Sequence, residues 1–353
     1  MPLSIDDMFK LVLDTGASDI IFTPGVPPTI WVAGKMRRIE YAPQTPEDIE
    51  RLFVPLLSEA QKTTLEQVGD VDFSIGRRGM GRFRMNVHRQ RGTVSAATRF
   101  IPHEVPSFES LNLPARALEF AKLPRGLVLV TGGAASGKST TLAAMIDIMN
   151  QKYAYHIITL EDPIEYTFRH QESLIEQREI GVDSPSFASA LRHVVRQRPD
   201  VVLIGEMRDL ETISTALTAA ETGHLVLATL HTTSAVQTID RITDIFPAAQ
   251  QSQVRVQLSS ALQGIICQML FHDQLNAKLI PAVEILVPTP AIRRAIRDED
   301  NHLLPGMLET GKSLGMQSMD ASIAALVARG HITAAEAVSH AHDIEKMKRT
   351  LAA

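Results

Sequence analysis

The chain has 353 residues, of which 44% are hydrophobic and 21% charged, so it exceeds the usual size of a single core and is too apolar to be disordered. Its formal net charge of -5 excludes a general attraction to nucleic acid or to an anionic membrane. The single cysteine, Cys267, excludes an internal disulfide and a thiolate zinc cluster, which fits a reducing cytosol.

The first hundred residues predict a small α+β domain, assigned here to residues 1–100. Two β-rich runs, 19–23 and 29–32, are separated by a turn rich in proline and glycine. A third run, 83–87, alternates apolar with polar residues, so one face of that strand is expected to pack and the other to face solvent.

Prolines interrupt residues 101–125, which predicts a linker with one short helix near 115–121. Residues 126–353 then alternate short apolar strands with helical patterns, which predicts an α/β domain with a mostly parallel sheet and a helical C-terminal region. One long helix is expected over 250–271. The predicted core strands are 127–131, 156–160, 201–204 and 225–229, and the predicted helices are 140–150, 187–197, 210–222 and one that opens with a capping box at Ser234 and Gln237.

The segment after the first of these strands satisfies the pattern G-x-x-x-x-G-K-S at a transition from strand to helix. Backbone N–H groups of such a loop bind phosphate oxygens, Lys138 supplies positive charge to the β and γ phosphates, and the Ser139 hydroxyl ligates Mg²⁺. A chance match in a glycine-containing turn is the alternative, which the strand-loop-helix context disfavours. The expected site for ATP and Mg²⁺ comprises Gly132, Gly133, Ala134, Ala135, Ser136, Gly137, Lys138, Ser139 and Thr140.

Acidic residues stand at the carboxyl ends of two other predicted strands, where open parallel sheets bind their ligands. These residues are Glu161 and Glu206. Hydrolysis of a nucleotide requires one acid that orients or deprotonates the attacking water and another on the magnesium side. A helix cap or an ion pair with Arg208 or Arg178 is the alternative role, but two such acids beside a P-loop favour catalysis.

A histidine and two arginines are further candidates. His231 follows the predicted strand 225–229, where it would contact the γ-phosphate, and a structural histidine is an equal alternative. His224, at the other end of that strand, is too distant to share a metal ion with it. Arg84 and Arg99 lie on paired strand patterns and would stabilise the γ-phosphate from another domain or subunit, although the residues alone favour a solvated strand face.

The chain resembles the PilT family of type IV pilus retraction ATPases, within the secretion and pilus motors, over nearly its whole length. Residues 159–165, 199–209 and 222–232 are similar to the family's aspartate box, atypical Walker B motif and histidine box. Residues 291–298 are similar to the AIRNLIRE motif of the retraction ATPases. The chief departure is at 133–135, where Gly-Ala-Ala replaces the family's usual Pro-Thr-Gly.

That departure predicts slow turnover. If position 135 requires a positive φ, an alanine there costs on the order of 1 kcal/mol, enough to slow the enzyme or weaken binding without abolishing either.

The resemblance implies a RecA-like ATPase domain preceded by a PAS-like domain, in a homo-hexameric ring that binds ATP between neighbouring subunits. It implies that Glu161 is the base, Glu206 the magnesium-side acid, and Arg84 and Arg99 the arginine fingers. It further implies a cytoplasmic motor, peripheral at the inner-membrane base of the pilus, that acts with a platform protein and with other pilus ATPases to power retraction and twitching motility.

Two other functions stay open. An accessory ATPase of the PilU type would bind ATP and join another motor but turn over little by itself. A RecA-like nucleic-acid motor would use arginines 192, 196 and 198 on a basic helix, although the negative net charge and the lack of an aromatic-basic stripe disfavour direct binding of nucleic acid. No apolar run approaches the ~18 residues of a membrane span, so the chain is expected to reach a membrane only through partners.

Overall fold

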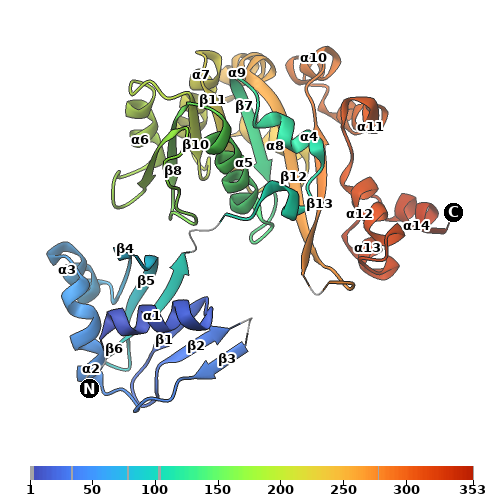
Figure 1. Cartoon of the computed structure of the whole chain (residues 1–353). Coiled ribbons are helices and arrows are strands. Elements are labelled where there is room, and N and C mark those ends of the chain that lie inside the picture. Colours follow the sequence, from blue (N-terminus) through green and yellow to red (C-terminus); the bar gives the residue numbers. More distant parts are fainter. Residues whose placement is uncertain (1–3, 33–34, 78, 102–104, 277, 353) are drawn as a thin grey trace. The chain divides into compact units, whose positions relative to one another are not determined.

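The computed structural model describes residues 4–32, 35–77, 79–101, 105–276 and 278–352. The chain divides into two compact units (Figure 1). The first comprises Met1–Glu104 and Glu165–Thr167, and the second comprises Val105–Ile164 and Phe168–Ala353. Of the predicted linker, residues 102–104 lie outside the described part of the chain, while Phe108, Ala117 and Phe120 are buried in the core of the second unit.

The first unit is a six-stranded antiparallel sheet with helices, in the order β3-β2-β1-β6-β5-β4. The predicted alternation at 83–87 is confirmed, because Phe83, Met85 and Val87 are fully buried. Phe9 of the first helix stacks on Phe83 with ring centroids 3.7 Å apart, which anchors that helix on the sheet. The described elements are α1 (Ile5–Thr15), β1 (Asp19–Phe22), β2 (Thr29–Val32), β3 (Lys35–Arg38), α2 (Pro46–Phe53), α3 (Glu59–Gln67), β4 (Asp70–Arg77), β5 (Gly81–Gln90) and β6 (Thr93–Ile101).

The second unit is built on a seven-stranded sheet in the order β13-β12-β7-β11-β10-β8-β9. Every pair in it is parallel except β12 with β13. The strands are β7 (Gly126–Thr131), β8 (His156–Glu161), β9 (Leu174–Glu179), β10 (Val201–Ile204), β11 (Leu225–Leu230), β12 (Leu262–His272) and β13 (Leu279–Leu286).

Helices cover both faces of this sheet, and the continuous apolar runs of its strands follow from that burial (Figure 1). Along β7, Leu127 and Leu129 pack into one core cluster while Val128 and Val130 pack into the other. The helices before and between the strands are α4 (Ala115–Phe120), α5 (Lys138–Lys152), α6 (Phe187–Val194), α7 (Leu210–Glu221), α8 (Ala235–Asp244) and α9 (Ala248–Ala261).

Among the described residues, five α-helices follow the last strand, where the sequence predicts a helical C-terminal region. Thr289 caps the first of them by accepting a hydrogen bond from Ile292 N, and Pro290 occupies its first turn. The five are α10 (Pro290–Asp298), α11 (Leu304–Thr310), α12 (Met319–Ala328), α13 (Ala334–His340) and α14 (Ile344–Ala352).

The prediction of one long helix over 250–271 is wrong. Helix α9 ends at Ala261, and the chain continues directly as β12. A continuous apolar run does not distinguish a buried helix from a strand covered on both faces, and Ile265 and Ile266 favour the strand. The ring of Phe120 also occupies the place where a Cβ at Gly264 would stand.

The helix predicted over 187–197 is shorter than expected and ends at Val194. Pro199 disfavours helical backbone at the residue before it, and Arg198 adopts a φ of 57°. Of the arginines predicted on one basic helix, only Arg192 lies on it, where it pairs with Glu211 at 3.2 Å.

The capping box predicted at the start of α8 is half present. Ser234 accepts a hydrogen bond from Gln237 N at 3.2 Å, but the Gln237 side chain accepts from Thr233 rather than from Ser234 N.

Candidate nucleotide site

Four of the predicted site segments lie along one edge of the large sheet. Strands β7, β11, β10 and β8 are neighbours and parallel, so their carboxyl ends share that edge. The P-loop follows β7, His231 follows β11, Glu206 stands two residues after β10, and Glu161 ends β8. This is the position at which open parallel sheets bind ligands.

The P-loop leads into the N-terminus of helix α5, which offers backbone donors to an anion. Helix α5 begins at Lys138 and has no side-chain cap, so its first N–H groups face the loop. The Lys138 ammonium donates to the carbonyl oxygens of Gly132 and Gly133 at 2.9 and 2.8 Å. The buried Ser136 hydroxyl has no hydrogen-bond partner among the described residues. The first N–H groups of α5, the Lys138 ammonium and the Ser136 hydroxyl can each donate a hydrogen bond to an anion.

Ala135 of the P-loop adopts a backbone conformation that normally favours glycine. Ala135 has a φ of 58°, in the left-handed region that a Cβ disfavours. Position 135 therefore has the positive φ on which the prediction of slow turnover depends.

Gln268 of β12 supports the P-loop, and sequence reasoning did not identify it. Its carbonyl oxygen stands where a Cβ at Gly132 would be, and its amide nitrogen is 2.6 Å from the place of a Cβ at Gly137. Its Oε1 accepts a hydrogen bond from Thr141 of α5 at 2.8 Å. No local pattern marks Gln268, because it is distant in sequence and its strand resembled a helix.

Glu161 is held by two polar neighbours. Its Oε1 accepts a hydrogen bond from the Thr159 hydroxyl at 2.6 Å and from the Gln177 amide at 3.2 Å. Gly205 of the Walker B segment lies against this residue, since a Cβ at 205 would be 3.3 Å from Glu161 Cα and 3.1 Å from the Leu160 carbonyl oxygen. The glycine that replaces the usual aspartate therefore lets β10 approach the end of β8 closely.

Glu206 pairs with Arg208 and contacts His231 at the same edge. Arg208 Nη2 lies 2.7 Å from Glu206 Oε2, and His231 Nε2 lies 3.3 Å from Oε1. Burial raises the pKa of Glu206, but the hydrogen bond from Arg208 and the charges of His231 and Arg208 outweigh it, so the pKa is lowered and the group is a carboxylate. The structure thus joins Glu206 and His231, which the sequence placed separately.

Arg84 and Arg99 lie directly opposite one another on β5 and β6 of the first unit. Arg84 Nη2 is 3.9 Å from Asp72 Oδ1, and Arg99 Nε is 2.7 Å from Asp19 Oδ1. The arginine side chains are 42% and 66% exposed and line a cavity of about 560 Å³ together with Trp31. Both guanidinium groups are therefore accessible.

Among the residues that the structure describes, no three His, Cys, Asp or Glu side chains gather as a metal site. Within the same residues, no helix has the length and apolarity to span a membrane.

A P-loop on a parallel sheet covered on both faces, with acids at the adjacent strand ends, defines a P-loop ATPase with a RecA-like core. Residues 108–284 match the model of the type II/IV secretion system protein family. By this match and by the relatives described next, the chain belongs to that family of secretion and pilus ATPases.

Two curated relatives from Pseudomonas aeruginosa match nearly the whole chain. The type IV pilus retraction ATPase PilT is 43% identical over 94% of this chain and 96% of its own length. The type IV pilus ATPase PilU is 37% identical over 98% of this chain and 91% of its own. A crystal structure of the pilus retraction motor PilT with bound ADP has a TM-score of 0.91 at 47% identity and covers 98% of this chain and 99% of that one.

Proposed function

We propose that this chain is the ATP-hydrolysing subunit of a motor that retracts type IV pili. The observation that carries the proposal is the extent of the match to PilT, which spans 331 residues and so covers both units. A P-loop alone fits many activities, because function belongs to sites rather than to folds. A match that includes the arginine-bearing unit supports the activity of the whole relative.

In this function the P-loop binds the phosphates of ATP. Lys138 exchanges its two carbonyl partners for β and γ phosphate oxygens, and the first N–H groups of α5 bind the same groups, with Ser139 and Thr140 beside them. Ser139 and Glu206 offer the oxygen ligands that Mg²⁺ prefers, Glu206 through water. The bound ion would neutralise phosphate charge.

For hydrolysis we assign the base to Glu161, which stands at the strand end with its carboxylate oriented by Thr159 and Gln177. His231, whose Nε2 lies 3.3 Å from Glu206 Oε1, would contact the γ-phosphate. Arg84 and Arg99 would stabilise charge on the γ-phosphate from the first unit of a neighbouring subunit, in a homo-hexamer. The assembly would act in the cytoplasm at the inner-membrane base of the pilus, with a platform protein and other pilus ATPases.

An accessory ATPase of low activity is the second candidate, and Ala135 favours it. A strained backbone in the phosphate loop opposes tight binding of nucleotide, and the chain also matches PilU. A nucleic-acid motor loses support, because Arg192 is paired and the other two arginines lie beyond the end of α6.

Phosphate release by the purified protein, with and without Mg²⁺, tests the proposal. We expect Mg²⁺-dependent hydrolysis by a species of hexameric size, and we expect Glu161→Gln to reduce it about a thousandfold while ATP binding is retained. Binding without hydrolysis in the wild type would favour the accessory function instead. In cells, loss of the chain should abolish twitching and leave surface pili in excess, and normal twitching would contradict retraction.

A further inference from the structure

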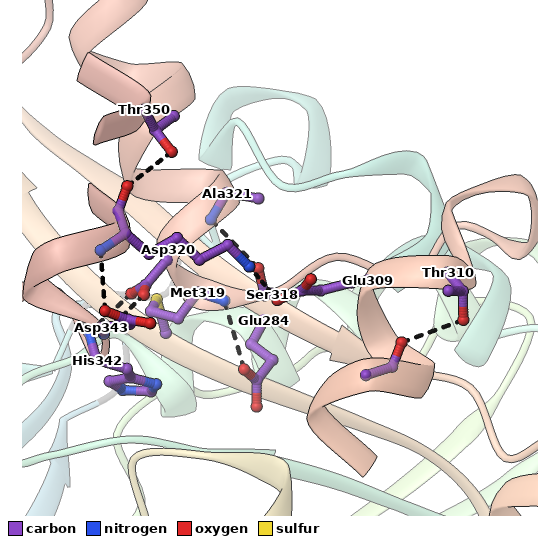
Figure 2. Close-up of polar contacts among 12 residues, drawn as sticks. Glu284, Glu309, Thr310, Ser318, Met319, Asp320, Ala321, His342, Asp343 and Thr350 are labelled. Carbon is purple, nitrogen blue, oxygen red and sulfur yellow. Dashed lines mark hydrogen bonds and ion pairs between the residues drawn. The ribbon is translucent and has the colours of Figure 1, made fainter. Parts of the chain in front are cut away.

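One buried carboxylate in the second unit accepts hydrogen bonds from the first residues of two separate helices. Glu284 of β13 is 4% exposed. Its Oε1 accepts from Ala235 N, the first residue of α8, at 2.7 Å, and its Oε2 accepts from Met319 N, the first residue of α12, at 3.4 Å (Figure 2 shows the contact with Met319).

At the start of each helix, a serine and Glu284 accept hydrogen bonds from different backbone N–H groups of the first turn. Ser234 accepts from the third residue of α8, and Ser318 accepts from the third residue of α12, Ala321. Glu284 serves the first N–H group of each helix, which a serine cap leaves without a partner. The positive ends of two helix dipoles therefore meet at one negative group, which fixes the two helix starts relative to each other.

Residues 231–234, called the histidine segment here, begin with His231 of the nucleotide site and lead directly into helix α8. The Thr238 hydroxyl lies 2.6 Å from the Thr232 hydroxyl, next to His231, and donates to the Ser234 carbonyl oxygen at 2.7 Å. The backbone from His231 to α8 is thus bound back onto the helix. A displacement of Ala235 would consequently move His231.

The P-loop side is connected through Cys267. Cys267 is paired with Glu284 across β12 and β13, and its sulfur accepts a hydrogen bond from the Thr131 hydroxyl at 3.1 Å. Thr131 is the residue before Gly132, and it is fully buried, as is Cys267. Glu284 therefore lies between the strand that carries the P-loop and the helix that follows the histidine segment.

The other side of the connection continues into the C-terminal helices. Asp320, beside Met319 on α12, accepts hydrogen bonds from His342 N at 2.8 Å and Asp343 N at 2.9 Å, just before α14 (Figure 2). Glu284 thus joins the start of α8 to the start of α12, and Asp320 joins the start of α12 to the start of α14.

Burying a carboxylate costs free energy of desolvation, which an apolar side chain in this place would not. Burial raises the pKa of Glu284 and outweighs the two N–H donors, which lower it. A well-packed apolar side chain would suffice for stability alone. The specific contribution of Glu284 is its two acceptor oxygens, aimed at two different helices.

From this geometry we infer that Glu284 is a positioning residue, which couples the P-loop and the histidine segment to α12 and α14, so that nucleotide binding is transmitted to the C-terminal helices. The inference rests on the proposed function, since it concerns the nucleotide site described above.

The two oxygens allow the two contacts to be separated by mutation. Glu284→Gln keeps one oxygen, which takes the shorter bond from Ala235, and turns its NH₂ group toward Met319 N. We expect Glu284→Gln to keep kcat within about threefold of wild type, but to lose the decrease in amide hydrogen exchange that ADP with Mg²⁺ produces in α12 and α14.

Glu284→Ala removes both contacts. We expect kcat to fall about tenfold or more, because the histidine segment loses its fixed position, while KM changes less than about threefold. Asp273→Asn is the matched control. Asp273 is a buried acid of the same hairpin that binds His331 and Asn276. Its partner His331 follows the end of α12 and donates to Leu326 O there, so the described hydrogen bonds connect Asp273 to neither α8 nor the start of α12.

The inference is overturned if Glu284→Gln retains the nucleotide-dependent protection of α12 and α14, or if Asp273→Asn reproduces the loss of kcat. The exchange experiment on Glu284→Gln decides the matter if the alanine variant does not fold. If the wild type binds ADP but releases no phosphate from ATP, the proposed ATPase function fails, and the exchange experiment still tests the coupling.

Discussion

The nucleotide-binding edge of the second unit and the arginine face of the first unit hold their charged groups in different ways. At the P-loop, Lys138 is buried and bound by two backbone carbonyl groups, and Glu161 is fixed by neighbours on its own strand and the next. On the first unit, Arg84 and Arg99 are exposed, lie opposite one another, and pair with Asp72 and Asp19 of neighbouring strands. Exposed ion pairs contribute little to the stability of the fold, so each arginine can leave its acidic partner at small cost. The second unit is thus a preformed site, and the first unit offers charges that can leave their partners for a ligand.

The sharpest test of this comparison removes the exposed charges. Arg84→Gln and Arg99→Gln should each reduce kcat about a hundredfold, because a guanidinium that meets the γ-phosphate stabilises charge formed during hydrolysis. Thermal stability should stay within a few degrees of wild type, since these side chains are exposed. Phosphate release and thermal melting measure both effects. Unchanged hydrolysis in both variants would return the arginines to a solvated strand face.

A second test asks how rigid the preformed site is. Gly132→Ala places a Cβ against the Gln268 carbonyl oxygen at a φ of 145°, so it should weaken nucleotide binding about tenfold or more and destabilise the protein. Gly133→Ala is the matched control, because a Cβ there meets no atom within 4 Å. Titration with a fluorescent ADP analogue measures the affinities. Equal losses in the two variants would show that Gln268 does not fix the loop.

A third test relieves the strain in the loop. Ala135→Gly removes a Cβ from a residue with a φ of 58°, which should return on the order of 1 kcal/mol to the loop. Turnover or nucleotide affinity should rise several-fold, up to about tenfold. No change in either quantity would mean that the alanine does not limit this enzyme.

The smallest expected effect concerns pH. The pKa of Glu206 is lowered in the folded chain from its ordinary value of 4.5, so its polar contacts stabilise the protein above that ordinary pKa. That stability is lost as the pH falls through the folded pKa. Glu206→Gln should remove this component, which we expect to be below about 1 kcal/mol. Urea unfolding between pH 3 and pH 6 measures it, and an identical pH dependence in the variant would contradict the assignment.

The parts of the site that were predictable lie in continuous segments. The P-loop and Glu161 are local signals, each placed by a strand that ends beside it, and parallel strands bring such ends to one edge. The pairing of Glu206 with His231 follows from the adjacency of β10 and β11, which the sequence suggests only by order.

Gln268 and Glu284 were not predictable, because their roles depend on strands whose neighbours are distant in the chain. Both lie in the β12–β13 hairpin, and the apolar run that forms β12 fits a helix equally well. Side chains that act across a sheet leave no periodic signal, so the connection from β13 to two helix starts is visible only in three dimensions.

The burial of Cys267 has a practical consequence for measuring motion. Its thiol is fully enclosed, and burial raises its pKa, so it will not react with maleimide dyes in the folded protein. The natural chain therefore has no background labelling. Met36→Cys in the first unit and Leu314→Cys in the second, at positions 60% and 49% exposed, provide sites for a pair of fluorophores. Energy transfer between them would report whether the distance between the two units changes when ATP is bound and hydrolysed.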